Sequence, residues 1–570
     1  MLSAAPIGAK ATAPSMTEDP LIGLARSIQE DPNDAVAWCH LGIALARAGR
    51  QADGEACLRH ALSLRPDDAG LLNNLGTMLT LRQATDEAAE CYLKSLVLRP
   101  RHADTCRNYA SLLFSQGRID DAVAHYRQAL TLSPNHPITH SDMLFALSRS
   151  ADIDASSLYA EHRNYAAHHE IPLHSYRHKH ELPDDPTRVI RIGFVSGDFR
   201  NHSVAYFFEP ILRLLAQDPR FYLVAYSNSR IADAVTTRMK REFSVWRPTT
   251  DIGDNEMAEL IHRDGIDILV DLSGHTAGNR LPVFARKPAP LQASWLGYPG
   301  TTGLDAMDYY ICDRRMLPSG LLDSQFSESI VRLAWGVPFQ WPEDTPPPIP
   351  LPALDCGHVC FGSFNNPDKL NAKTLGAWAD LLHAIPGSRL MICGVESGSL
   401  LATLADACSR EGIPPGRTVF RERTPFAEYL RLHHEVDLCL DAFPYNGGTT
   451  TLHALRMGVP TLTITGNTMP ARIGTGLLES VGLGEFVSTD CRQFVERGVE
   501  WAGRLPELAE IRRTLPQRLA ESGIGRPELV AACMANAFVT MWWRWCSGQR
   551  PAPFDAGVDE DQARPISRET

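Results

Sequence analysis

Residues 445–460, YNGGTTTLHALRMGVP, have the composition of a phosphate-binding turn. Gly447 and Gly448 lead into Thr449, Thr450 and Thr451, and a helical pattern follows. The start of a helix carries unpaired N–H groups and a partial positive charge, both of which attract anions. The alternative is a plain threonine N-cap. Because two glycines and three threonines exceed what a cap requires, we favour a phosphate site.

Two other residues could act on the same anion. Lys369, in SFNNPDKLNAKTLGAWADLL, lies between a buried strand and an amphipathic helix, where its charge could face the phosphate. His202, in SGDFRNHSVAYFF, precedes an apolar helix and could bridge the anion and the reacting centre. The alternatives are an ordinary surface lysine and a helix-capping histidine.

A third segment could enclose a sugar or a peptide. Gly297, Pro299, Gly300 and Gly303 form a tight loop after a strand, in LQASWLGYPGTTG; the alternative is a simple turn. The sequence has no Walker A motif, GxSxG, dinucleotide fingerprint or paired zinc ligands, and no Asp-x-Asp pair that would hold a divalent metal on a diphosphate. A bound diphosphate would therefore be neutralised by the helix start and Lys369, without a metal ion or other cofactor.

Parallel sheets must position these residues. From residue 189 onwards, short apolar runs alternate with helical segments, which is typical of strands covered on both faces. A proline-rich linker at 338–352 separates two such series. The candidate residues all follow predicted strands, and open α/β sheets bind ligands at the carboxyl ends of their strands.

The front of the chain contains a repeat. Pro32, Pro66, Pro100 and Pro134 are each 34 residues apart, with small residues at fixed phase between them. This period predicts about three and a half tetratricopeptide helix pairs, which stack into a superhelix with a concave face. Three residues in phase could grip an extended peptide there, or could simply face water: His40, Asn74 and Asn108.

Composition excludes several classes of protein. The net charge of −12 argues against a nucleic-acid partner. The thirteen cysteines form no CxxC pair, which fits a reducing compartment. No signal peptide and no apolar run of about 20 residues is present, so we expect a soluble, cytoplasmic protein without a membrane partner.

The predicted fold class is α plus α/β: a tetratricopeptide superhelix followed by two Rossmann-like lobes. The expected parts are a flexible N-terminus at 1–19, repeats at 20–135, a helical connection and linker at 136–187, a first lobe at 188–345, a second at 346–530, and a C-terminal helix with a disordered tail at 531–570. We expect that helix, which is rich in tryptophan, to pack across the lobes.

These segments resemble the family typified by protein O-linked N-acetylglucosamine transferase, over residues 20–530 or so. The similarity rests on the order of RIGFVSGDFRNH, DLSGHTAGNRLPVFARKPAPLQASWLGYPGTTG, CFGSFNNPDKL and VDLCLDAFPYNGGTTTLHAL, and on the proline spacing. It implies the two-lobed GT-B architecture. It also implies an inverting, metal-independent transfer of N-acetylglucosamine from UDP-GlcNAc to Ser/Thr hydroxyls of protein or peptide acceptors that lie along the repeat groove.

The resemblance also implies roles for single residues. His202 matches a histidine near the phosphate and the acceptor, and Lys369 a lysine that steadies the departing diphosphate. Thr449 to Thr451 match the phosphate-binding helix start. The remaining implied contacts are Asn366 near the diphosphate, Thr424 and Tyr429 at uracil and ribose, and Gly297 to Gly300 at the sugar. Asp198, His202 and His275 are candidates for the base, a phosphate oxygen could relay the proton instead, and His275 is also a candidate for peptide contact.

One departure from the family pattern concerns the ribose. Many members carry an acid one turn into the phosphate helix, where this chain has His453 followed by Arg456. A neutral imidazole accepts one hydrogen bond, whereas a carboxylate can accept two. We therefore expect weaker or pH-dependent donor binding. The repeat array is also short, which leaves less surface for choosing acceptors.

Three other functions remain open. The first is transfer of glucose from UDP-glucose to asparagine, although relatives of that kind typically lack 34-residue repeats. The second is a scaffold that binds UDP without turnover. The third is transfer to a small molecule or a polysaccharide, which would leave a peptide-binding repeat unexplained.

Overall fold

The computed structural model describes residues 20–183, 185–341, 345–395 and 398–557. The predicted flexible N-terminus at 1–19 lies outside these residues. The chain divides into two compact units, Met1–Thr139 and His140–Thr570.

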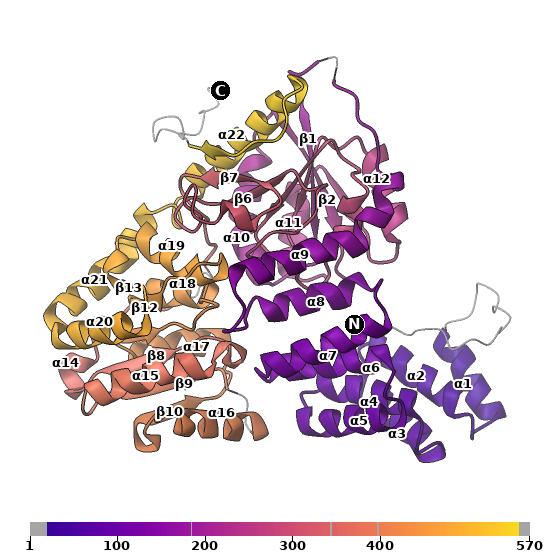
Figure 1. Cartoon of the computed structure of the whole chain (residues 1–570), viewed down its shortest axis with the longest axis horizontal. Helices are drawn as coiled ribbons and strands as arrows, with labels where there is room; N and C mark the ends of the chain where they lie inside the picture. Colours follow the sequence, from indigo (N-terminus) through magenta and orange to yellow (C-terminus); the bar gives the residue numbers. More distant parts are fainter. Residues whose placement is uncertain (1–19, 184, 342–344, 396–397, 558–570) are drawn as a thin grey trace. The chain divides into compact units, whose positions relative to one another are not determined.

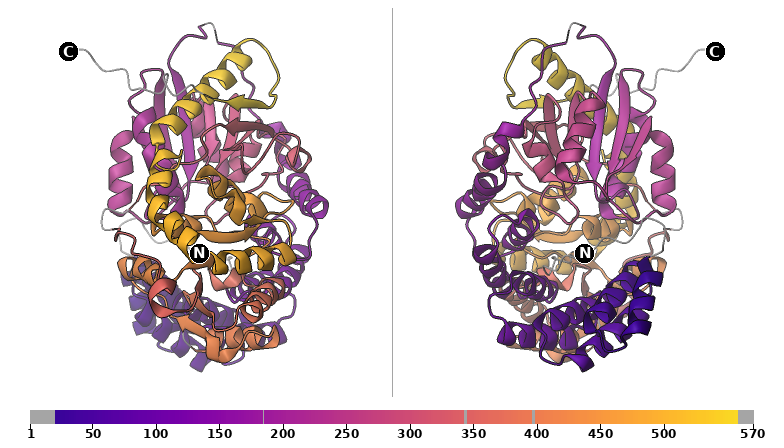
Figure 2. Two further views of the ribbon diagram at one scale, coloured as in Figure 1. Left: turned by 90° about the vertical axis from the view of Figure 1, so that its left-hand side faces the viewer. Right: turned by 90° about the vertical axis from the view of Figure 1, so that its right-hand side faces the viewer.

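The first unit is a stack of helix pairs, which the right-hand view of Figure 2 shows in indigo. The first helices of the pairs begin at Ala35, Ala69 and Ala103, so the structure keeps the 34-residue period. The helices are α1 (Pro20–Glu30), α2 (Ala35–Arg47), α3 (Gln51–Leu64), α4 (Ala69–Leu81), α5 (Thr85–Leu98), α6 (Ala103–Ser115) and α7 (Ile119–Leu132). The tetratricopeptide prediction is confirmed.

Small residues allow the paired helices to approach closely. A Cβ added to Gly42 would lie 2.8 Å from the carbonyl oxygen of Gly54, and one added to Gly76 would lie 2.8 Å from the ring of Tyr92. Asp34 caps α2 by accepting hydrogen bonds from backbone N–H groups of its first turn. The fixed phase of small residues therefore reflects helix contact.

The three in-phase groove residues have different surroundings. Asn108 Nδ2 donates to Asn73 Oδ1 at 3.0 Å and to Thr77 Oγ1 at 3.2 Å, and Asn74 Nδ2 donates to Cys39 Sγ at 3.3 Å. Both amides thus link neighbouring repeats, while His40 is exposed. Peptide binding by these residues stays a prediction.

The second unit begins with a helical connection. Helix α8 (Pro137–Leu147) crosses the boundary between the units, and α9 (Ala155–His169) and a 3₁₀ turn, η1 (Ile171–Tyr176), follow it. The histidine-rich linker after η1 packs on the first lobe: the ring of His178 stacks on His262 at 4.1 Å, and His180 Nε2 lies 2.8 Å from the carbonyl oxygen of Lys287.

The first lobe contains a parallel sheet of eight strands among the described residues, in the order β14-β7-β6-β5-β4-β1-β2-β3. Its strands are β1 (Ile190–Ser196), β2 (Phe221–Ser227), β3 (Val245–Pro248), β4 (Ile268–Asp271), β5 (Leu291–Trp295), β6 (Tyr309–Asp313), β7 (Ser329–Leu333) and β14 (Phe554–Ala556). Its helices are α10 (Ser203–Leu215), α11 (Ala234–Glu242), α12 (Asp254–Arg263) and α13 (Leu281–Ala285), with a 3₁₀ turn η2 (Asp323–Gln325). Strands β1, β4, β5 and β6 are almost wholly buried, as their continuous apolar runs predict, whereas the edge strands β3 and β14 are not.

The second lobe holds a parallel sheet of six strands in the described part of the chain, in the order β10-β9-β8-β11-β12-β13. They are β8 (Cys360–Ser363), β9 (Arg389–Cys393), β10 (Thr418–Arg421), β11 (Leu438–Leu440), β12 (Thr461–Ile464) and β13 (Val487–Ser488). Its helices are α14 (Ala353–Cys356), α15 (Ala372–Ala384), α16 (Ser399–Arg410), α17 (Phe426–Leu432), α18 (Thr449–Arg456), α19 (Ile473–Ser480), α20 (Cys491–Gly503) and α21 (Leu505–Glu521); the 3₁₀ turns are η3 (Pro367–Lys369), η4 (Pro415–Arg417), η5 (His433–Glu435), η6 (Pro470–Arg472) and η7 (Gly484–Phe486). Figure 1 shows this lobe in orange and the first in magenta. Two Rossmann-like lobes are confirmed.

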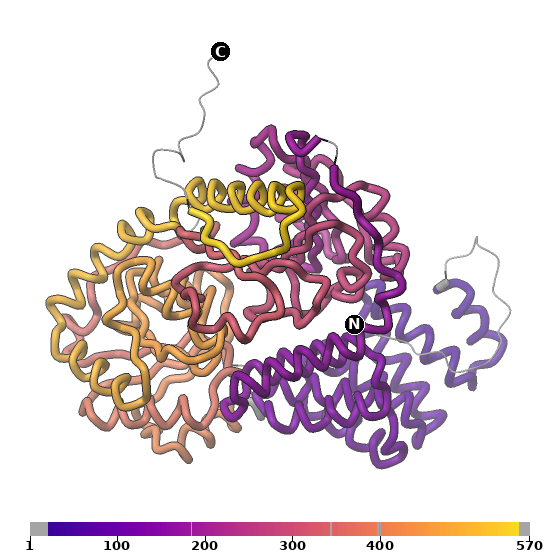
Figure 3. The backbone as a smooth tube through the Cα atoms, turned by 45° about the horizontal axis from the view of Figure 1, so that its top comes forward, coloured from indigo at the N-terminus to yellow at the C-terminus, as the bar shows by residue number. Residues whose placement is uncertain are grey.

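The C-terminal segment returns to the first lobe. Helix α22 (Pro527–Cys546) begins four residues before the predicted boundary at 531, and its apolar face, including Met534, Phe538 and Trp542, joins the core of the first lobe. Figures 2 and 3 show it in yellow beside the magenta strands. The expectation that it lies across both lobes is therefore wrong. The predicted disorder is wrong for residues 554–556, because β14 pairs with β7.

The chain crosses between the lobes at two places that touch. Phe339 N, on the way out, donates to the carbonyl oxygen of Ile524, on the way back, at 3.1 Å. A Cβ added to Gly523 would lie 1.7 Å from the carbonyl oxygen of Trp335. Only glycine allows this approach.

None of the helices in the described residues combines the length and the apolar character that a membrane crossing requires.

Candidate functional site

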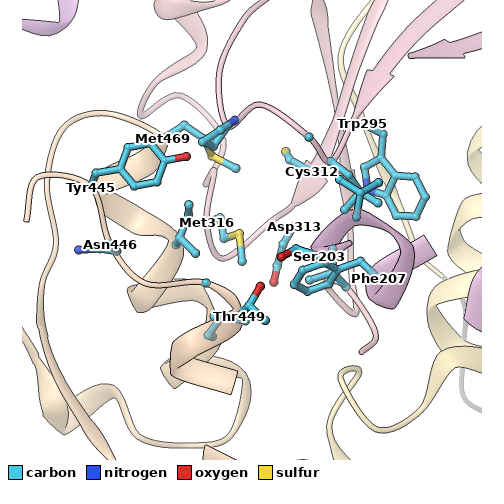
Figure 4. A pocket seen from close by; sticks show the side chains of 18 of the residues that line it. Ser203, Phe207, Trp295, Cys312, Asp313, Met316, Tyr445, Asn446, Thr449 and Met469 are labelled. Carbon is cyan, nitrogen blue, oxygen red and sulfur yellow. The ribbon is translucent and has the colours of Figure 1, made fainter. Parts of the chain in front are cut away.

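A cavity of about 380 Å³ lies between the carboxyl ends of the two sheets. The first lobe contributes the loops after β1, β5 and β6, and the second lobe contributes the loop after β8 and the start of α18. Figure 4 shows side chains of both lobes around it. Of the residues predicted for the site, the following line this cavity: His202, Gly297, Pro299, Asn366, Lys369, Gly448, Thr449 and Thr450.

The glycine–threonine turn starts α18 with no side-chain cap. Gly448 occupies the N-cap position, so the threonines are not caps and the alternative of a plain N-cap does not apply. Thr449 and Thr450 line the cavity, whereas Thr451 Oγ1 donates to the carbonyl oxygen of Gly447 at 3.0 Å. The first N–H groups of α18 thus have the orientation that attracts an anion.

A buried carboxylate holds this turn in place. Asp441, at the end of β11, accepts hydrogen bonds from Gly447 N and Thr463 Oγ1, each at 2.7 Å. Burial raises its pKa to about 6, although these donors oppose the shift. A Cβ added to Gly447 would lie 2.6 Å from Thr450 Oγ1, so Gly447 shapes the turn from below while Gly448 faces the cavity.

Lys369 presents its cation at the edge of the same turn. Its Nζ donates to the carbonyl oxygen of Asn446 at 2.9 Å and lies 4.7 Å from the centre of the Tyr445 ring. Burial, followed by repulsion from Arg149, lowers the pKa of Lys369 to about 8. Its neighbour Asn366 lines the cavity and donates through Nδ2 to Asp368 at 3.0 Å.

Arg149 does not line the cavity but contacts residues at its edge, and sequence reasoning missed it. It follows α8, pairs with Asp368, and places its guanidinium 5.1 Å from the centre of the Tyr445 ring. Arg149 and Lys369 thus put two cations beside one carboxylate and one ring. No motif surrounds Arg149 in the sequence, so no local signal could have found it.

His202 is both a cap and a cavity residue. Its Nδ1 accepts from Val204 N at 3.3 Å and lies 3.5 Å from Asp198 Oδ2. Burial lowers the pKa of His202, with Asp198 opposing the shift. A neutral imidazole that accepts at Nδ1 carries its proton on Nε2. The contact with Val204 favours this tautomer, whereas the contact with Asp198 favours a proton on Nδ1; in either form the side chain lines the cavity.

The other two candidates for the base are less accessible. His275 is only 1% exposed; its Nδ1 and Nε2 lie 3.0 Å from Ser141 Oγ and from the carbonyl oxygen of Thr302. Both ring nitrogens are therefore engaged inside the first lobe, and we do not retain its predicted peptide contact. Asp198 is buried and accepts from Arg200 at 3.2 Å.

The residues implied for uracil and ribose form a separate cluster on α17 and α18. Tyr429 Oη lies 3.2 Å from His453 Nδ1, and the rings of Phe339 and Phe426 pack against the imidazole. Burial lowers the pKa of His453 to about 4, so this histidine is neutral near pH 7 and is not a source of pH dependence there. Thr424 Oγ1 is buried without a hydrogen-bond partner among the described residues.

The loop after β5 lines the cavity in part. Gly297 has a φ of +50°, and a Cβ there would lie 2.5 Å from the carbonyl oxygen of Leu272. Pro299 also lines the main cavity, whereas Gly300 faces a smaller one beside Tyr298. The structure thus brings Gly297 and Pro299, but not Gly300, to the cavity that holds Lys369.

Two carboxylates, Asp313 and Asp441, were also missed. Each is the polar residue that ends or follows a buried strand, in MDYYICD and VDLCLD. Asp313 lines the cavity. The position of an acid at a carboxyl strand end was the signal available for both. In the described residues, no group of three or more His, Cys, Asp or Glu side chains has the arrangement of a metal site.

Two known protein families match the segments that form the repeats and the two lobes. The model of glycosyl transferase family 41 matches residues 119–336 and 352–527, and a tetratricopeptide-repeat model matches 39–103 and 85–137. The chain belongs to glycosyl transferase family 41. The two family 41 segments contain every residue that lines the cavity except Val337, and the gap between them, at 337–351, coincides closely with the proline-rich linker.

Individual relatives support the family assignment. A mutant of the O-GlcNAc transferase of Thermobaculum terrenum is similar in structure, with a TM-score of 0.83 and 31% identity over 93% of this chain and 100% of that one. The probable UDP-N-acetylglucosamine–peptide N-acetylglucosaminyltransferase SPINDLY of Oryza sativa subsp. japonica is 35% identical over 411 residues, 69% of this chain and 43% of that protein. The protein of the same name in Arabidopsis thaliana is 36% identical over 381 residues, which are 65% of this chain and 41% of that protein. The chain spans less than half the length of these curated family 41 relatives.

Proposed function

We propose that this protein transfers N-acetylglucosamine from UDP-GlcNAc to Ser/Thr hydroxyls of proteins, with inversion and without a metal ion. The observation that carries the proposal is the convergence of Lys369, His202 and the uncapped start of α18 on one cavity. The named activities of similar proteins, from Thermobaculum terrenum and from plants, agree with it.

The chemistry requires positive charge where the diphosphate leaves. As the acceptor oxygen attacks the anomeric carbon, the bond from that carbon to the phosphate oxygen breaks and negative charge grows on UDP. In this proposal, Lys369, the hydroxyls of Thr449 and Thr450, and the N–H groups at the start of α18 stabilise this charge. Preorganised donors of this kind usually supply the largest part of the rate enhancement.

The walls of the cavity suit an N-acetylated sugar. They are largely apolar, with contributions from Val204, Phe207, Trp295, Met316 and Leu477. Such a surface gains free energy when it covers an acetyl methyl group. Glucose has no such group, which favours UDP-GlcNAc over UDP-glucose as the donor.

A transfer assay tests the function. The purified chain is offered UDP-GlcNAc or UDP-glucose, labelled in the sugar, together with a cell lysate and EDTA. We expect label on protein from UDP-GlcNAc, released by mild alkali as a Ser/Thr-linked sugar, and a β-linked product. Label only from UDP-glucose would indicate the sister activity, label on a polysaccharide or small molecule the third alternative, and binding without transfer a scaffold. Turnover that stops with EDTA would contradict the metal-independent route.

Donor binding should weaken at alkaline pH. Because the pKa of Lys369 is lowered to about 8, the ligand-free protein loses this cation as the pH rises through 8. A diphosphate prefers the protonated lysine, so the Kd for UDP should approach a roughly tenfold rise per pH unit above pH 8. Titration calorimetry between pH 7 and 9 measures this slope. Lys369→Met should bind UDP more weakly and with a flat profile; an equal slope in this variant would assign the effect to another group.

A further inference from the structure

The apolar wall of the cavity contains one acid that the proposed reaction does not yet use. Asp313 is the last residue of β6 and lies beside Cys312 and Met316, with an exposed fraction of 3%. In Figure 4 its carboxyl group points into the pocket, toward the side where Ser203 and Thr449 also lie. A buried carboxylate in such surroundings needs hydrogen-bond donors.

The described residues donate only some of the hydrogen bonds that the Asp313 carboxylate can accept. Oδ1 accepts from Arg315 N at 2.8 Å, and the guanidinium of Arg315 lies 3.9 Å from the same oxygen. No donor to Oδ2 is recorded among the described residues. A Cβ added to Gly336 would lie 2.6 Å from Oδ2, so the glycine keeps the space around this oxygen open. Burial raises the pKa of Asp313 to about 6, which shows how poorly the charge is solvated.

The ligand group that completes this site must donate hydrogen bonds and cannot be an anion. A phosphate would be repelled by the carboxylate, and the phosphate-binding groups belong to the second lobe, at Lys369 and Thr449. A hydroxylated ring with apolar faces satisfies both the carboxylate and the surrounding apolar side chains. Within the proposed function, that part of the donor is the sugar.

We propose that Asp313 Oδ2 accepts a hydrogen bond from a ring hydroxyl of the donor sugar and makes the cavity specific for hexoses that carry it. The inference rests on the proposed function. Asp313 is then a specificity-determining residue: without that hydroxyl, Oδ2 would stay buried and unpaired, which is why sites built for a hydroxyl reject its deoxy analogue strongly.

Calorimetric binding of UDP and UDP-GlcNAc to the full chain tests this. Asp313→Asn should leave the Kd for UDP within about twofold and raise the Kd for UDP-GlcNAc roughly 10- to 100-fold, the range for a hydrogen bond to a charged group. Asp305→Asn is the matched control, because Asp305 lies in the same lobe, is exposed and does not line the cavity. It should change neither Kd.

A second arm uses the unaltered protein and changes the ligand. Among the 3-, 4- and 6-deoxy analogues of UDP-GlcNAc, one should bind roughly 10- to 100-fold more weakly than the parent, and Asp313→Asn should not distinguish that analogue from the parent. This arm decides the matter even if the variant does not fold.

The outcomes separate this inference from the proposed function. If the unaltered protein binds neither UDP nor UDP-GlcNAc, the proposed function fails, and the inference fails with it. If it binds both but all deoxy analogues bind equally, only the inference fails. A variant that binds UDP-GlcNAc normally but turns over slowly would make Asp313 a base instead, and would overturn the specificity role.

Discussion

Lys369→Ala should lower kcat by roughly 10²- to 10³-fold while the protein stays folded, an effect comparable with the loss of one oxyanion-hole donor. The lysine is a cavity-lining cation in direct contact with the phosphate-binding turn, through Asn446 and Tyr445. Its removal leaves the negative charge that grows on UDP without its main counter-charge. Steady-state transfer from UDP-GlcNAc measures the effect.

Folding should survive this change. Burial of the charged ammonium group destabilises the fold, as its lowered pKa indicates. Alanine removes this penalty, and the gain offsets the loss of the hydrogen bond to Asn446. Thermal unfolding should therefore change little. Lys373→Ala is the matched control: Lys373 is exposed on α15, four residues away, and does not line the cavity. An active Lys369→Ala protein would refute the assignment of the phosphate site.

Gly297→Ala should damage both stability and activity. The φ of +50° costs a residue with a side chain roughly 1–2 kcal/mol. The new Cβ would lie 2.5 Å and 2.7 Å from the backbone oxygens of Leu272 and Ser273, which adds about 1–3 kcal/mol of strain. Because the loop forms one wall of the cavity, a displacement of about 1 Å should lower kcat/KM about 10²-fold.

Gly320→Ala separates the two causes. Gly320 lies in the same lobe with a φ of +78°, but nothing lies within 4 Å of the Cβ that alanine would add. The stability of this variant should fall only by the cost of the left-handed conformation, and its activity should be unchanged. Thermal unfolding and transfer rates of the two variants, measured side by side, give the comparison. If both lose equal stability and neither loses activity, the close approach at Gly297 has no functional importance.

The sequence was sufficient for most of the architecture. The repeats could be predicted because Pro32, Pro66, Pro100 and Pro134 recur at the same position of successive helix pairs. The buried parallel strands could be predicted from their continuous apolar runs. The strands that were not predicted, β3, β13 and β14, are short and lie at the edges of the sheets. They have only two to four residues, too few for a periodic signal, and β14 also depends on a distant partner, because Phe554–Ala556 aligns with β7.

The site was predictable where one short segment carries the chemistry. The glycine–threonine turn, Lys369 and His202 do so, and they line one cavity. Arg149 was not predictable, because its contact with Asp368 joins residues more than 200 positions apart. The sequence also did not show which residues of the turn face the cavity. Thr449 and Gly448 do so, whereas Thr451 and Gly447 shape the turn.

The paired crossings between the lobes restrict how the active site can open. With a single connection, one lobe could swing, twist or slide against the other. Here the outgoing and returning segments are hydrogen-bonded at Phe339 and Ile524 and packed at Gly523. Both must bend at the same point, so the easiest motion is a rotation about one axis through that point. If the proposed transfer takes place in this cavity, entry of the donor and release of UDP would both depend on this one rotation.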